Sequence, residues 1–82
     1  MGFYMKRFEL TAVVWKEGKA YVSKCTELGV ASYGKTPEKA IVALGEAVEL
    51  YLVNAEKLGF FEDVKPSIES AARFTSPLHI QI

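Results

Sequence analysis

Residues Gly18 to Ala40 read GKAYVSKCTELGVASYGKTPEKA, and this stretch decides the fold. A glycine-containing turn opens it, and two short runs that carry Tyr and Val follow. At its end Thr36 can cap a free backbone N–H, Pro37 suits the first helical position, and Glu38 places a negative charge in the first turn. The stretch therefore predicts two strands followed by the start of a helix.

The residues before this stretch predict a further strand. From Phe8 to Lys16, apolar residues recur at every second position, which is the pattern of a half-buried strand. Together with Ala20 to Cys25 this segment predicts a hairpin, because the intervening turn contains a glycine. Val30 to Tyr33 adds a short third strand, stopped by Gly34. We expect a three-stranded meander.

The residues after the stretch predict one long helix that ends at Gly59. Its apolar residues recur at alternating spacings of three and four and form one stripe: Ile41, Leu44, Val48, Tyr51, Ala55 and Leu58. The polar, Pro-containing stretch from Glu62 to Ser70 predicts a loop. Leu78, Ile80 and Ile82 alternate with polar residues and predict a final strand.

The expected element order is β-β-β-α-β, an α+β fold. A right-handed crossover through the helix would place the last strand parallel to the first and beside it. We therefore expect a four-stranded mixed sheet of spatial order 3-2-1-4 with one long helix on one face. Residues 1–82 are expected to form a single domain.

Composition narrows the class of function. Ten basic residues balance ten acidic ones, so the long-range attraction behind non-specific nucleic-acid binding is missing. Cys25 is the only cysteine, which rules out an intrachain disulfide and fits a reducing cytoplasm. No run approaches the roughly 20 apolar residues of a membrane span. We expect a cytoplasmic protein that binds no membrane.

Beyond these general patterns, the order of the motifs resembles the HicB-like antitoxin family. The likeness covers roughly Phe8 to Leu58: a glycine turn, a Tyr-Val strand, the Glu27-Leu28 pair, a Gly-x-Thr-x-Glu-x-Ala helix start, and a helix that continues through Glu46 to Leu52. The resemblance implies a partial ribonuclease H-like fold. It also implies an antitoxin that binds and occludes a small, basic HicA-type toxin that cleaves mRNA.

One departure from the family pattern adds an alternative. Many HicB-like proteins carry a C-terminal DNA-binding segment, whereas this chain is expected to form a single HicB-like domain with no C-terminal DNA-binding domain. This argues against direct DNA binding. It also leaves room for an orphan relative that acts as a protein-binding module without a cognate toxin.

An enzyme is the first alternative from another class. Ribonuclease H-type chemistry needs several carboxylates around divalent metal ions. Asp63 is the only Asp in the chain, and Glu9 is the only acid within the first predicted strand. We therefore expect no enzyme, no catalytic residues, no metal and no cofactor, with a metal-dependent nuclease as the alternative. A nucleic-acid-binding module is the second alternative.

Two sets of residues are candidates for partner binding. The first is aromatic and projects from the predicted sheet: Trp15, Tyr21 and Tyr33. The second is an acidic stripe on the helix that could face a basic toxin: Glu46, Glu49 and Glu56. Large aromatic residues dominate interface energetics. An acidic helix face, in contrast, is often merely solvated.

A third set of residues predicts self-association. The last strand, with Leu78, Ile80 and Ile82, contains no Lys, Arg, Asp or Glu and would leave an unprotected sheet edge. The apolar surface of the helix also exceeds what a three-stranded sheet covers. We expect a homo-oligomer, a dimer or a tetramer.

Overall fold

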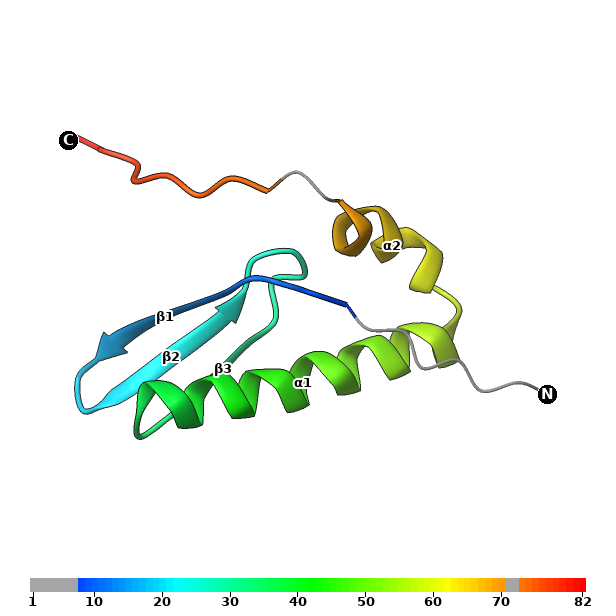
Figure 1. Ribbon diagram of the computed structural model, residues 1–82, viewed down its shortest axis with the longest axis horizontal. Helices are drawn as coiled ribbons and strands as arrows, with labels where there is room; N and C mark the ends of the chain where they lie inside the picture. The colour runs from blue at the N-terminus through cyan, green and yellow to red at the C-terminus, as the bar shows by residue number, and fades with distance from the viewer. Residues whose placement is uncertain (1–7, 71–72) are drawn as a thin grey trace.

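The computed structural model describes residues 8–70 and 73–82 of the chain. It contains strands β1 (Ala12–Glu17), β2 (Ala20–Cys25) and β3 (Ala31–Gly34), and helices α1 (Pro37–Leu58) and α2 (Phe61–Glu69). In Figure 1 the sheet lies above the long helix α1, and α2 lies beyond the end of the sheet. Residues 74–82 form an extended segment, which we call the tail.

The three strands form the expected antiparallel meander, in the order β1-β2-β3. Trp15 pairs with Val22, and Val22 pairs with Tyr33, so these three residues form one row across the sheet. Side chains alternate between the two faces of a strand, which places Ser23 on the face opposite to Val22. The Ser23 hydroxyl donates a 2.8 Å hydrogen bond to the Ala40 carbonyl of α1. The row therefore lies on the face away from α1, which we call the outer face.

The predicted long helix is confirmed, and its two ends follow from local chemistry. The Thr36 hydroxyl accepts a 3.1 Å hydrogen bond from the Lys39 N–H, and Pro37 occupies the first helical position. Gly59 has a φ of 82°, and its N–H bonds to the carbonyls of Ala55 and Glu56. A residue with a side chain rarely adopts this left-handed conformation, so the glycine ends the helix at low cost.

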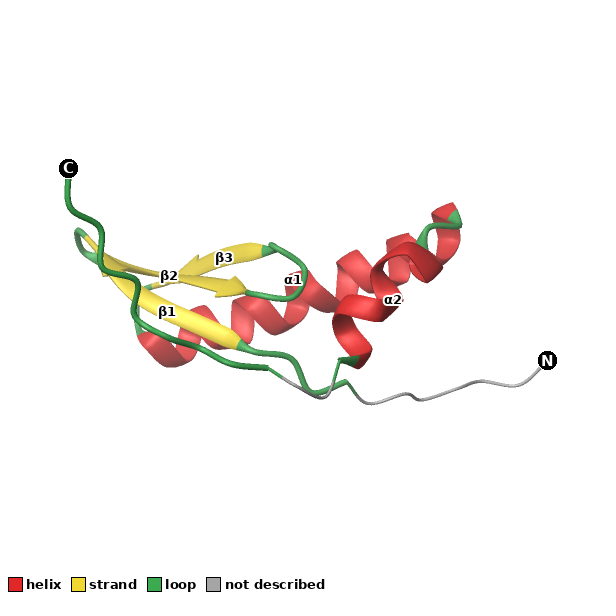
Figure 2. Ribbon diagram, turned by 90° about the horizontal axis from the view of Figure 1, so that it is seen from above, coloured by secondary structure: helices red, strands yellow, loops and turns green. Residues whose placement is uncertain are grey.

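The core lies between α1 and the sheet. Of the three strands, α1 packs mainly against β3 and β2 and contacts β1 least. Seen from above in Figure 2, α1 crosses the sheet obliquely and runs on beyond its end. As a result Ile41, on the predicted buried stripe, remains 49% exposed. The buried apolar residues are Cys25, Ala40, Leu44, Ala55 and Ile68.

The structure corrects the loop predicted for Glu62 to Ser70, since most of this stretch lies in α2. Pro66 within the helix cannot donate a backbone hydrogen bond and normally disfavours helix. Against this cost, Phe61 and Ile68 lie on the inner side of α2, and Ile68 is buried. The free energy gained by burying the Ile68 side chain outweighs the cost of placing Pro66 within the helix.

The structure also corrects the predicted fourth strand. Leu78, Ile80 and Ile82 lie in the tail, which forms no strand, so the sheet has three strands in place of the mixed sheet of order 3-2-1-4. The described residues form two helices in place of one long helix. Alternating apolar residues are compatible with a strand, but a strand also needs a neighbour for its backbone hydrogen bonds. The tail diverges from β1 along its length and lacks that neighbour (Figure 1).

Candidate functional site

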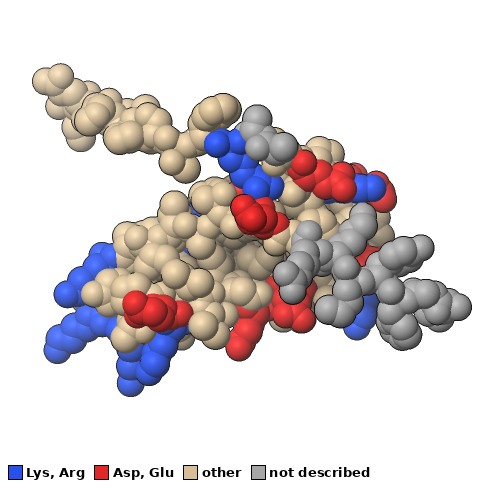
Figure 3. Space-filling view, in the orientation of Figure 1, with Lys and Arg blue, Asp and Glu red and all other residues tan. Residues whose placement is uncertain are grey.

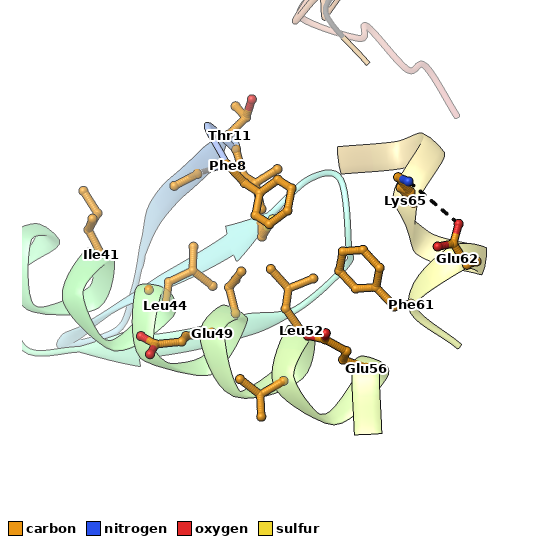
Figure 4. A pocket seen from close by; sticks show the side chains of 16 residues that line it. Phe8, Thr11, Ile41, Leu44, Glu49, Leu52, Glu56, Phe61, Glu62 and Lys65 are labelled. Carbon is orange, nitrogen blue, oxygen red and sulfur yellow. Dashed lines mark ion pairs between the residues drawn. The ribbon is translucent and has the colours of Figure 1, made fainter. Parts of the chain in front are cut away.

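An open groove of about 1030 Å³ runs between the start of β1, α1 and α2. Figure 4 shows Leu44 and Leu52 of α1 pointing toward Phe8, with Phe61 of α2 at one end of the groove. The groove exists because α1 packs mainly under β2 and β3 and leaves the inner side of β1 partly uncovered. Its floor is therefore apolar, and a binding partner would gain mainly from the burial of hydrophobic side chains.

Charged side chains border this groove. Glu49 and Glu56 lie along its α1 side, and Glu62 and Lys65 lie on its α2 side. The Lys65 ammonium and the Glu62 carboxylate are 4.0 Å apart, at the limit of an ion pair. Glu46 lies apart from this groove, beside a shallower depression on α1. The predicted acidic stripe is thus divided between two surfaces.

The outer face of the sheet is the second candidate surface. Trp15 is 41% exposed and Tyr33 is 73% exposed, with Val22 between them in the row. Both helices lie elsewhere: α1 covers the opposite face, and α2 packs on α1. Tyr21 neighbours Val22 in β2 and so points to the α1 side. The structure thus brings two of the three predicted aromatic residues together, while Tyr21 is separated from them.

A buried ionic cluster joins the tail to the sheet, and sequence reasoning did not identify it. The Glu27 side chain is only 7% exposed, and its Oε2 lies 3.0 Å from Arg73 Nε. The two atoms make an ion pair whose angle falls outside hydrogen-bond geometry. Arg73 also donates hydrogen bonds to the carbonyl oxygens of Glu9 and Ile68. This arginine therefore links the β2–β3 loop, the segment before β1 and the end of α2.

Hydrogen bonds stabilise the charged form of Glu27. Burial of the carboxyl by itself raises its pKa, but the Thr11 N–H and the Cys25 thiol donate to Oε1 at 2.9 and 3.6 Å. These donors outweigh burial and lower the pKa of Glu27 from 4.5 to about 2. Glu27 is ionised at neutral pH and holds the start of β1 against the loop that follows β2.

The described residues form neither a metal-binding cluster nor a reactive thiol site. No three His, Cys, Asp or Glu side chains within residues 8–70 and 73–82 lie close enough to share a metal ion. Burial raises the pKa of the Cys25 thiol above its ordinary value of 9.0, which disfavours the reactive thiolate. Neither helix of the described chain combines the length and apolar character needed to cross a membrane.

The residues predicted for self-association are all on the surface. Leu78, Ile80 and Ile82 project from the tail into solvent. Figure 3 shows the tail as an uncharged extension, with basic side chains only near its root. The groove, the outer face and the tail are three apolar surfaces that the described residues expose, and Val42 and Leu50 are further exposed apolar residues on α1.

Comparisons of the chain with protein-family models, with curated proteins and with solved structures find no match. The resemblance to HicB-like antitoxins therefore stays a prediction that depends on the motifs quoted above.

Proposed function

We propose that the chain is a protein-binding module and not an enzyme, acting as a HicB-like antitoxin that covers a small, basic HicA-type toxin. The second form of this proposal is an orphan relative that has no cognate toxin and binds another protein. The observation that carries it is the apolar row on the outer face, where Trp15, Val22 and Tyr33 cross all three strands.

The composition of the outer face suits a protein partner. Trp and Tyr supply large contact areas with little loss of conformational entropy, and they are enriched among the residues that dominate binding energy. Lys24 pairs with Val13 and Ala31 on the same face and is exposed, which adds a polar margin to the apolar row. An apolar centre with a polar margin is the usual anatomy of a protein interface.

The resemblance supplies the class of partner. The observed order of three antiparallel strands followed by a long helix agrees with what the resemblance implies for Phe8 to Leu58. Glu49 and Glu56 are exposed beside the groove of α1, away from the outer face, and would attract a basic partner only at long range. The balanced total charge disfavours nucleic acid as the main ligand.

A binding titration tests the proposal. The probe is the HicA-type toxin encoded by the reading frame next to the gene of this chain, with its catalytic histidine replaced so that it can be produced. We expect a 1:1 or 2:2 complex by calorimetry. The double variant Trp15→Ser/Tyr33→Ser should weaken binding at least about 100-fold, since two central aromatic residues are lost.

The matched control is Phe74→Ser, which removes an exposed aromatic side chain from the tail instead of from the sheet. This control should leave the affinity unchanged within about twofold. Equal binding by the wild type and the double variant would contradict the role of the outer face. Absence of any such toxin gene, or no binding by the wild type, would contradict the antitoxin role.

A further inference from the structure

The edge of β1 is open to pairing. Within residues 8–70 and 73–82, β1 pairs with β2 on one side and has no strand on the other. Thr11 accepts a 3.1 Å backbone bond from the Thr26 N–H, and hydrogen-bonded positions alternate along an antiparallel pair. The residues whose backbone groups point outward are therefore Ala12, Val14 and Lys16. Such an edge is a template for a further strand.

The apolar groove lies beneath the start of this edge. Ala12 lines it from β1, and Ile41, which is half exposed, lines it from α1. Gly45 also lines the groove, and a Cβ added there would meet no atom within 4 Å, so the floor is roomy. A strand hydrogen-bonded to β1 would direct every second side chain toward the α1 side of the sheet, where this groove begins.

The tail carries alternating apolar side chains, which is the pattern that pairing with this edge above an apolar groove requires. Leu78 is 83% exposed, Ile80 is 72% exposed, and Ile82 is fully exposed. In an extended chain these three side chains share one face. Residues 78–82 match the five-residue span from Ala12 to Lys16, and the tail holds no Lys, Arg, Asp or Glu that would have to be desolvated.

The root of the tail directs it away from its own sheet. Arg73 is held by the Glu27 carboxylate and by the carbonyl oxygens of Glu9 and Ile68. From this anchored root the tail runs outward and leaves the β1 edge of the same chain uncovered (Figure 1). Each chain thus exposes both an apolar extended segment and an edge with a groove that fits it.

We propose that two copies of the chain exchange tails. Residues 78–82 of each copy pair with the β1 edge of the other, and Leu78, Ile80 and Ile82 enter the groove of that other copy. The same two surfaces meet twice, so the contact closes into a two-fold symmetric dimer. This dimer uses the inner side of β1 and is separate from the outer face that is proposed for the toxin.

Light scattering during size-exclusion chromatography of the full chain provides the first test. We expect twice the chain mass at micromolar concentrations. The variant Leu78→Ser/Ile80→Ser/Ile82→Ser should raise the dimer dissociation constant at least about 100-fold, because three buried apolar contacts are lost. All three side chains are exposed within one chain, so the variant retains the fold, which circular dichroism checks.

The matched control is His79→Ser/Gln81→Ser, which changes the alternate side chains of the same segment. Its dissociation constant should stay within about threefold of the wild-type value. A monomeric wild type at millimolar concentration would overturn the proposal. So would a dimer that the triple variant leaves intact.

A second measurement distinguishes exchange from any other dimer. In a sample mixed from isotope-labelled and unlabelled chains, filtered NMR spectra detect contacts between copies alone. We expect such contacts between the Ile80 methyl groups of one chain and the Ile41 methyl groups of the other. Tail exchange would be overturned if Ile80 contacted Ile41 only within the same chain. It would also be overturned by a dimer that shows no Ile80–Ile41 contact between its two chains.

Discussion

Gly34 at the end of β3 lies against the backbone of Ala40 in the first turns of α1. A Cβ added to Gly34 would lie 2.5 Å from the Ala40 nitrogen and 2.8 Å from the Lys39 carbonyl carbon. Backbone atoms of a helix cannot move aside as a flexible side chain does. Glycine at this position therefore allows the helix to pack tightly against the end of the sheet.

Gly34→Ala should destabilise the fold by about 2 kcal/mol or more, because the added methyl group forces β3 and α1 apart. Denaturant unfolding measures the change. The control Gly45→Ala lies in the exposed interior of α1 with no atom near the new Cβ, and it should add about 0.5–1 kcal/mol of stability. Equal effects of the two substitutions would contradict the close packing.

Glu27 should make the stability of the fold depend on pH in the acid range. Its pKa is about 2 in the folded chain against an ordinary 4.5, so the folded state favours the ionised form. This contribution is fully present above pH 4.5 and is lost as the pH falls from 4.5 to about 2. Urea unfolding at several pH values measures the slope.

Glu27→Gln should flatten that slope and lower stability at pH 7 by about 2–3 kcal/mol, since it leaves the partly buried Arg73 without its ionic partner. Glu17→Gln, at the exposed end of β1, is the control and should leave the slope intact. If the acid-range slope persists in Glu27→Gln, another carboxylate is responsible.

The packing of α2 against the rest of the chain should depend mainly on Ile68. Ile68→Ala removes a buried side chain and is expected to cost about 2–4 kcal/mol of stability, with earlier loss of helical signal at 222 nm on heating. Val42→Ala on the exposed side of α1 should change stability by less than about 0.5 kcal/mol. An unchanged midpoint for Ile68→Ala would show that α2 is not packed.

Cys25 should react with thiol reagents only when the structure opens. It is buried, and burial raises the pKa of its thiol, so both access and ionisation are limited. At pH 8 labelling should be at least about 100-fold slower in native protein than in denaturant, because it requires transient opening. The control is the double variant Cys25→Ser/Ser76→Cys, whose exposed thiol should react at the same rate in both conditions.

Part of the candidate site followed from the sequence. The placement of Trp15 and Tyr33 in neighbouring strands was predictable, since the alternation and the turn at Gly18 specify the strands. Their shared face and the position of Tyr21 on the opposite one required the register of the strands. The groove was not predictable, because it depends on how far α1 is shifted beneath β1.

The sequence by itself determined the meander and α1, because their signals are local. Thr36 caps a helix three residues away, and Gly59 ends it by its own backbone conformation. Only the tertiary structure decided that Pro66 lies in a helix, since burial of Ile68 supplies the energy. It also decided that Leu78 to Ile82 form no strand in this chain, because a strand requires hydrogen-bonding partners from a distant segment. Arg73, held by Glu27, lies at the root of the tail, and from there the tail diverges from the free edge of β1 (Figure 1).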